Sequence, residues 1–253
     1  MNWTELIRFK VLCESADVAV PPPILRCLEL TDAIASHDNW PTGSLLSLTD
    51  DEARERVTEM SIRSHQGAFE SSRGMRPGIS AFTDELLLEV REAALPHLDA
   101  IVLELRPKFE ELAAPIVTAA QKYGFTWQTK SDQVIDLADE AASAAWRANR
   151  DAWTAVAPIS RLRIAISDVF NVSPTETDQV HTLAGFNQVD HSACFAAGNS
   201  WSLDGAYYVN RKVPGQIDWL ALAVGGLTLN TPDEVRQKYS DKSAAQRALS
   251  IVQ

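Results

Sequence analysis

The chain has 253 residues, of which 45% are hydrophobic and 23% are charged. These are ordinary proportions for a folded globular protein, and they exclude a chain that is disordered throughout. The formal net charge of −11 excludes general binding to nucleic acid or to an anionic membrane surface, because both require a basic protein surface. We therefore expect neither a nucleic-acid partner nor a membrane partner.

Several features of the sequence indicate the compartment. The three cysteines lack CxxC spacing and do not form a disulfide framework, which fits a reducing compartment. The first residues lack a basic segment followed by a long apolar run, so no signal peptide is expected. The longest near-apolar run, Trp219–Leu229, is about half of what a membrane-spanning helix needs. Arginine outnumbers lysine 16 to 7, a bias typical of GC-rich bacterial or phage genomes. We expect a soluble protein in the cytoplasm, or within a virion if a phage encodes it.

Residues 1–81 are predicted to form an N-terminal segment that is helical or mixed. A short helix is predicted over Trp3–Glu14 and a second over Ile24–Ser36. Between them lie three prolines, residues 21–23, which favour an extended chain.

The second half of this segment begins with a helix-start signal. Thr49 is followed by three acidic residues, which complement the positive end of a helix, and Glu52 completes a capping box. The helix that starts there is predicted to end near Gly67. Residues 71–80 contain two glycines and a proline, and are predicted to be a linker.

The centre of the chain, residues 82–170, predicts a long antiparallel helical hairpin. Thr83 is a predicted N-cap, and apolar residues recur at helical spacing from Leu87 to Ala120, before Gly124 as a C-cap. Because this apolar stripe continues past every proline, we predict one bent helix rather than a string of short ones. The prolines concerned are Pro96, Pro107 and Pro115.

The second helix of the hairpin carries a stricter pattern. Apolar residues alternate at four- and three-residue spacing over eleven consecutive positions from Val134 to Val169, as in a coiled coil. Alanine fills six of these positions and would let a partner helix approach closely: Ala138, Ala141, Ala145, Ala148, Ala152 and Ala155. A loop of about seven residues joins the two stripes, so the helices are expected to pack antiparallel, with Glu104 beside Arg150.

The last part, residues 171–253, is predicted to be an α+β segment. Residues 206–213, a Pro-Gly turn and residues 216–224 predict a β-hairpin. Leu227–Asn230 could add a third short strand, which would make a meander. The pattern also allows a helix over Asp218–Val224 instead of the second strand.

A final helix is predicted after Thr231, where a proline at the first helical position and an acid two residues later complete a helix-start signal. The fold class is therefore predicted as mainly α (α+β). Its centre is the long helical hairpin, preceded by the N-terminal helical segment and followed by a part containing a small β-hairpin or meander.

Four residues could carry chemistry: His181, Asp190, His191 and Cys194. These residue types ligate zinc, and a cysteine nucleophile with a histidine base needs only closeness in space. The CxxC, HxxxH and HExxH patterns of common zinc sites are missing, as are phosphate-binding and serine-hydrolase motifs. We favour the interpretation that the four are ordinary loop and core residues. No metal and no cofactor are expected.

Pairs of acids on the predicted helices offer a second candidate, because carboxylates bind magnesium. The pairs are Glu89 with Glu92 and Asp136 with Asp139. The predicted hairpin register places them about 40 Å apart. They are interpreted as solvated helix surface.

The alanine stripe and the lack of a compact catalytic motif favour a non-catalytic structural or assembly protein. It would self-associate, or bind a protein partner, through the helical hairpin. Two tryptophans one heptad apart flank the stripe and either widen its buried part or form an exposed aromatic pair at an interface. The interface candidates are Ala145, Trp146, Ala148, Ala152 and Trp153.

The alternative is a hydrolase or metal-dependent enzyme that uses the region from His181 to Cys194. Enzymatic activity is thus left open, with a non-catalytic role preferred. A small-molecule or regulatory binding domain is also compatible with the sequence, although no feature favours it.

Overall fold

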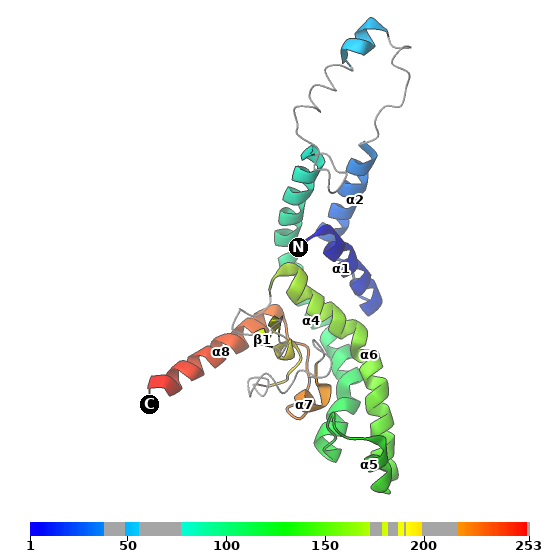
Figure 1. The fold of residues 1–253 in the computed structure, drawn as a ribbon, viewed down its shortest axis with the longest axis vertical. Coiled ribbons are helices and arrows are strands. Elements are labelled where there is room, and N and C mark those ends of the chain that lie inside the picture. The colour runs from blue at the N-terminus through cyan, green and yellow to red at the C-terminus, as the bar shows by residue number, and fades with distance from the viewer. Residues whose placement is uncertain are drawn as a thin grey trace. The chain divides into compact units, whose positions relative to one another are not determined.

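The computed structural model describes residues 1–37, 49–55, 77–172, 179–181, 187–189, 191–198 and 217–251 (Figure 1). This part of the chain is mainly helical, as predicted. It divides into two compact units, one with residues 1–3 and 21–94, the other with residues 4–20 and 95–253. No helix of the described ranges combines the length and the apolar character that a membrane crossing requires.

The two N-terminal helices are confirmed. Helix α1 (Trp3–Ala16) buries one apolar face that includes Leu6, Phe9 and Cys13. Helix α2 (Pro22–His37) begins earlier than predicted, so the expectation of an extended chain over residues 21–23 is wrong for the last two prolines. Prolines fit there because the N–H groups of a first helical turn have no acceptor within the helix.

The capping box at Thr49 is also confirmed. The backbone N–H and the hydroxyl of Thr49 both donate to the Glu52 carboxylate at 2.8 Å, and the Glu52 N–H donates back to the hydroxyl at 3.4 Å. Residues 50–55 are helical. The predicted end of this helix near Gly67 lies outside the described residues.

Helix α4 (Pro77–Tyr123) is a single helix that contains all three internal prolines, as predicted. It begins at Pro77, so the linker prediction is wrong for residues 77–80, and residues 71–76 lie outside the described ranges. Thr83 lies within the helix, so the prediction that it is the N-cap is wrong. A proline in the first turn starts the helix without losing a hydrogen bond, which explains the earlier start.

The C-terminal end of α4 is the predicted glycine cap. Gly124 has a φ of 63°, in the left-handed region that favours glycine. The Gly124 N–H donates to the Ala120 carbonyl, and the Phe125 N–H reaches back to the Ala119 carbonyl, both at 3.1 Å. These bonds satisfy carbonyls that the helix end would otherwise leave unpaired.

The second predicted helix is divided into α5 (Ser131–Asp136) and α6 (Glu140–Phe170). Ala138 adopts a φ of 49°, which interrupts the helix. The Asp139 carboxylate then accepts hydrogen bonds from the backbone N–H groups of Ala141 and Ala142, at 2.8 and 3.2 Å, and starts α6. The heptad pattern therefore does not run along one helix from Val134.

The heptad stripe and the buried face of α6 coincide only in the second half of the helix. There, Ile159, Leu162, Ile166 and Val169 are all buried, whereas Ala152 is the one buried stripe position in the first half of α6. In the first half, the stripe positions Ala141, Ala148 and Ala155 are exposed, and the residue after each of them is buried. A shift of one residue turns the buried line by about 100° around the helix. The first half of α6 thus carries a row of exposed alanines.

The ion pair predicted from the hairpin register is not formed. Glu104 and Arg150 make no ion pair with each other in the described part of the chain. Six residues from Glu104, nearly two helical turns along α4, the Glu110 carboxylate accepts from the Thr228 hydroxyl of the C-terminal part. The polar face of α4 is therefore directed in part toward the C-terminal segment.

Aromatic side chains anchor the core of the second unit. Phe109 of α4, Phe195 and Trp219 of helix α7 (Trp219–Ala223) form a cluster whose ring centroids lie 5.0–6.2 Å apart. Phe9 of α1 meets Phe170 of α6 edge to face at 5.0 Å. Both phenylalanines of this second pair are fully buried, so α1 is packed firmly on the end of α6.

Two short strands, β1 (Gln179–His181) and β2 (Asn187–Val189), pair antiparallel with Val180 opposite Gln188. They lie earlier in the chain than the predicted β-hairpin, whose residues 206–216 are outside the described ranges. The second strand predicted over residues 216–224 is wrong for residues 219–223, which form α7. The Asp218 carboxylate caps this helix by accepting from the Ala221 N–H at 3.1 Å, so a local cap decides between the two readings.

The final helix is confirmed as α8 (Pro232–Ile251). The Glu234 carboxylate accepts from the Thr231 N–H at 2.7 Å, and the Thr231 hydroxyl accepts from the Glu234 N–H at 3.1 Å. Before it, Leu227 forms an isolated β-bridge with Ala196 in place of the third strand.

Candidate functional site

The structure brings together two of the four residues singled out for chemistry. His191 immediately precedes the short 3-10 helix η3 (Ser192–Cys194), and Cys194 is its last residue. His181 belongs to β1, but the placement of its side chain lies outside what is described, as does Asp190 altogether. Across the described ranges, no three His, Cys, Asp or Glu side chains gather where a metal ion could bind.

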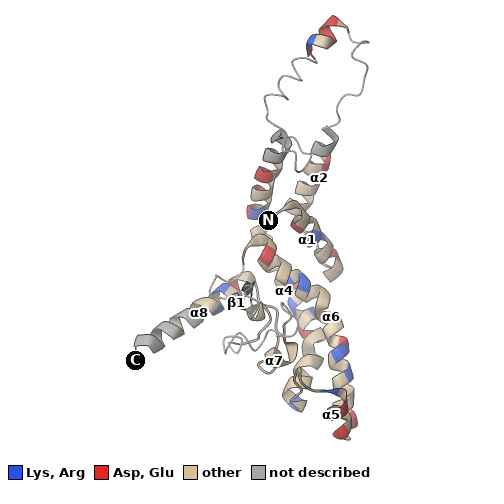
Figure 2. Ribbon diagram, in the orientation of Figure 1, with Lys and Arg blue, Asp and Glu red and all other residues tan. Residues whose placement is uncertain are grey.

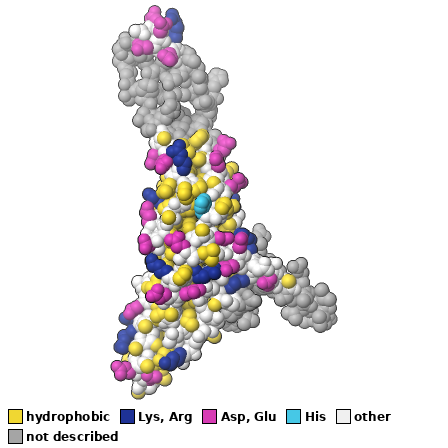
Figure 3. Space-filling model, turned by 180° about the vertical axis from the view of Figure 1, so that it is seen from behind, with side chains coloured by type: hydrophobic (Ala, Val, Ile, Leu, Met, Phe, Trp, Pro, Cys, Tyr) yellow, Lys and Arg dark blue, Asp and Glu magenta, His cyan; other side chains and the backbone are white. Residues whose placement is uncertain are grey.

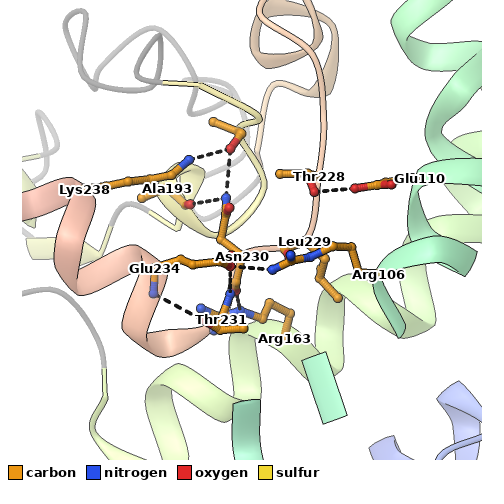
Figure 4. A network of polar contacts seen from close by, with 11 residues as sticks. Arg106, Glu110, Arg163, Ala193, Thr228, Leu229, Asn230, Thr231, Glu234 and Lys238 are labelled. Atoms are coloured by element: carbon orange, nitrogen blue, oxygen red, sulfur yellow. Dashed lines mark hydrogen bonds and ion pairs between the residues drawn. The ribbon is translucent and has the colours of Figure 1, made fainter. Parts of the chain in front are cut away.

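The η3 turn is held by Asn230, which lies just before α8 (Figure 4). Its side-chain amide donates to the carbonyls of Ala193 and Ala196 at 2.9 and 2.8 Å. Its backbone N–H donates to the Cys194 carbonyl at 2.9 Å. Asn230 is buried, so these bonds satisfy carbonyls that water does not reach.

Cys194 faces a buried polar group from α6. Its Sγ lies 3.8 Å from the Ser167 hydroxyl oxygen, which accepts a hydrogen bond from Nη1 of Arg163 at 2.8 Å. The Nε of Arg163 donates to the Asn230 carbonyl at 2.6 Å. Cys194 is 0% exposed and Arg163 only 1%, so this cluster is shielded from solvent.

His191 lies between the cysteine and a carboxylate. Its Nε2 is 3.4 Å from Oδ1 of Asp168, and its side chain is 12% exposed. Its Nδ1 is buried and has no hydrogen-bond partner of good geometry among the described residues, although the Cys194 thiol is close enough to act on the imidazole. A cysteine, a histidine and an aspartate in this order resemble a nucleophile, its base and the group that orients the base.

The electrostatics of the cluster favour charge separation. Burial raises the pKa of the Cys194 thiol, but the Arg163 guanidinium, the His191 imidazole and the Ser167 hydroxyl together hold that pKa below its ordinary value. Burial lowers the pKa of His191, yet its contact with Cys194 and the charge of Asp168 leave that pKa above its ordinary value. Both shifts favour a thiolate beside an imidazolium.

Further polar contacts fix the C-terminal segment around this cluster (Figure 4). Arg106 of α4 donates through Nε to the Leu229 carbonyl at 2.8 Å and pairs with Glu234 of α8. The Lys238 ammonium donates to the carbonyls of Ala196 and Gly198 at 2.6 and 3.1 Å. Helices α4, α6 and α8 thus meet around one buried turn.

The sequence analysis did not identify Arg163, Ser167, Asp168 or Asn230. The one available signal was Arg163 itself, a charged residue between the apolar stripe positions Leu162 and Ile166. A charged residue at the edge of a buried stripe is either exposed on the flank of the helix or buried against a polar partner. The periodicity could not distinguish these two cases.

The five interface candidates do not share one open face. Ala152 is buried, Ala145 and Trp153 are half-buried, and Trp146 packs edge to face on Phe125 at 5.3 Å. Only Ala148 is exposed. On the same helix, Nε1 of Trp153 and Oδ1 of Asn149 are buried and have no hydrogen-bond partner among the described residues.

The exposed surface near α5 combines apolar and charged side chains. Trp127, Ile135 and Leu137 are 48%, 68% and 58% exposed. Figure 2 shows acidic residues gathered at the α5 end and basic residues further along α6, and Figure 3 shows hydrophobic side chains at the surface among the charged ones. The exposed acids are Asp132, Asp136 and Glu140, and the exposed bases are Arg147 and Arg150. None of these five forms an ion pair with another described residue.

Comparison with known proteins adds no assignment, because no protein family, no curated protein and no solved structure matches the chain.

Proposed function

We propose that this chain is a structural or assembly protein that self-associates through an antiparallel hairpin of α4 and α6. The observation that supports the proposal is the exposed first half of α6, whose surface is complementary to itself. The occupant we assign to this surface is a second copy of the same chain.

The apolar part of this surface is a row of small side chains. Ala141, Ala148 and Ala155 are exposed at seven-residue spacing, and Ala144 lies beside them. Such small residues let two helix backbones approach closely, as in the seam of a coiled coil. Ile135 and Leu137 precede this row in the sequence and are largely exposed, and full burial of a large apolar side chain contributes about 1.5–3 kcal/mol. A partner helix would therefore gain free energy chiefly at the α5 end.

The charges on the same surface suit a two-fold antiparallel arrangement. The exposed acids Asp136 and Glu140 come before the alanine row in the sequence. Arg147 and Arg150 lie within the stretch of α6 that carries the row. With a two-fold axis near Ala144, Glu140 of each copy lies opposite Arg147 of the other, and Arg150 approaches the acidic turn at Asp136. Because a two-fold axis repeats every contact, each favourable pair occurs twice.

A charge-reversal experiment on the full chain tests this arrangement. The double variant R147E/R150E turns attraction into repulsion on both sides of the axis. Losing the four attractive pairs, at roughly 0.5 kcal/mol each, weakens the dimer by about 2 kcal/mol, or about thirtyfold in dissociation constant, and the new repulsion weakens it further. Light scattering coupled to size-exclusion chromatography measures the change.

Two further variants sharpen the test. Adding D136R and E140R to the double variant swaps the charges and should restore the dimer. Arg161 is exposed on α6 but lies outside the proposed surface, so R161E is the matched control and should leave the mass unchanged. Equal masses for the wild type and R147E/R150E would contradict the proposal.

A second candidate function is an enzyme with Cys194 as nucleophile, and the position of His191 between Cys194 and Asp168 favours it. It ranks second because Cys194 is fully buried, so a substrate could enter only if the turn of residues 191–198 moved aside. Turnover of simple fluorogenic esters or thioesters that disappears in C194A would support it. An unchanged background rate in C194A would remove it.

A further inference from the structure

Arg163 is a buried cation without a carboxylate partner. Its side chain is 1% exposed and forms no ion pair with an acid in the described part of the chain. Its hydrogen bonds go to the Asn230 carbonyl and to the Ser167 hydroxyl, which are both neutral. A guanidinium does not lose its proton in a protein, and a buried charge without a counter-ion destabilises the fold. A negative charge near Arg163 would remove this cost.

The nearby carboxylates do not supply that charge. Asp168 has a half-exposed side chain that pairs with His191, and Glu234 pairs with Arg106. Cys194 remains, because the Ser167 hydroxyl bridges its Sγ to Arg163 through contacts of 3.8 and 2.8 Å. A thiol in this position can become anionic, and Arg163 and His191 both favour that form.

We propose that Cys194 is held as a thiolate, the buried counter-ion of Arg163, and that it is the modification site of this chain for small thiol-selective oxidants such as hydrogen peroxide.

The other two cysteines provide an internal comparison. Burial raises the pKa of Cys13 to about 12, with a contribution from the neighbouring Glu14 carboxylate, and burial also raises the pKa of Cys27. All three cysteines are buried and free. They therefore differ in charge environment rather than in burial. Among the described residues, Lys238 of α8 is a further charged group near Cys194. Burial holds its pKa below the ordinary value, although Glu234 and the charge on Cys194 both act to raise that pKa.

The reaction with peroxide balances with groups present in the cluster. The thiolate sulfur attacks one peroxide oxygen, an S–O bond forms and the O–O bond breaks. The sulfur is oxidised by two electrons to sulfenic acid, and the peroxide is reduced to hydroxide. The His191 imidazolium gives its proton to the leaving hydroxide, which departs as water. Peroxide is little larger than water, so a small opening of the turn admits it while larger electrophiles are excluded.

Peroxide labelling of the folded full chain at neutral pH tests the proposal. The chain is then unfolded in the presence of a dione reagent, which traps sulfenic acid, and the adduct at each cysteine is quantified by mass spectrometry. We expect Cys194 to react at least about tenfold faster than Cys13 and Cys27, because the thiolate is the reactive form. Equal rates at the three cysteines would overturn the proposal.

A direct titration keeps the proposal testable even where variants fail to fold. The ultraviolet thiolate band of the wild type minus that of C194S should rise below pH 9.0, the ordinary pKa of a cysteine. S167A removes the bridging hydroxyl and should move this step to higher pH and slow the peroxide reaction, whereas R163K keeps a cation and should retain most of both. No difference between the wild type and C194S below pH 9.0 would refute the thiolate.

Discussion

Asn230 gives the sharpest test of how the C-terminal turn is held to the helices. In N230A, the buried carbonyls of Ala193 and Ala196 lose the amide that donates to them at 2.9 and 2.8 Å. The Ala193 carbonyl is then a buried acceptor without a donor, which costs about 1–3 kcal/mol, whereas the Ala196 carbonyl keeps its bond from Lys238. The free energy of unfolding should therefore fall by at least about 1–3 kcal/mol. N230D keeps the size of the side chain but directs a carboxylate at the same two carbonyls. We expect it to cost more than N230A at neutral pH.

Urea unfolding followed by circular dichroism measures both variants. The free energy of unfolding of N230D should recover as the pH falls, because a protonated carboxyl regains one donor for the turn. T228A is the matched control: it lies on the same segment, and its hydroxyl bonds an exposed Glu110 carboxylate, so it should cost less than about 1 kcal/mol. Costs for N230A and N230D that are no larger than that of T228A would refute the reasoning.

Three other substitutions test the fold. F109A removes a fully buried ring that packs on Phe195 and Trp219, and should lower the free energy of unfolding by about 3–5 kcal/mol in the same urea assay. G124A meets no atom within 4 Å of the added Cβ, so it should cost only the left-handed strain of about 1–2 kcal/mol, seen as a lower melting temperature. Burial raises the pKa of Asp218 above 3.8, so its contribution to stability is lost as the pH rises through that raised pKa. D218N keeps the acceptor for the Ala221 N–H but carries no charge, so it should be more stable than the wild type at pH 7, and this gain should vanish below about pH 3.8. An equal gain at both pH values would contradict the raised pKa of Asp218.

Local signals predicted most of the helices. The capping boxes at Thr49 and Thr231 and the glycine cap at Gly124 act within four residues, so the sequence carries them completely. The apolar stripe also predicted correctly that α4 continues through its prolines. The errors arise where two local signals compete: the cap at Asp139 overrides the heptad pattern, and the cap at Asp218 overrides the strand pattern.

The candidate site was predictable only in part. His191 and Cys194 are three residues apart and were identified together. The residues that give them their electrostatic character are distant in sequence, with Ser167 separated from Cys194 by 27 positions and Asn230 from Arg163 by 67. Helical periodicity describes which residues share a face of one helix. It does not specify which face a later segment covers, so Arg163 could not be paired with Cys194.

Sedimentation equilibrium of the unmodified full chain at several micromolar concentrations tests the proposed assembly function most directly. Self-association through α6 predicts a mass twice that of one chain at the higher concentrations, with dissociation promoted by salt because charged pairs flank the alanine row. A mass of one chain at every concentration would contradict it.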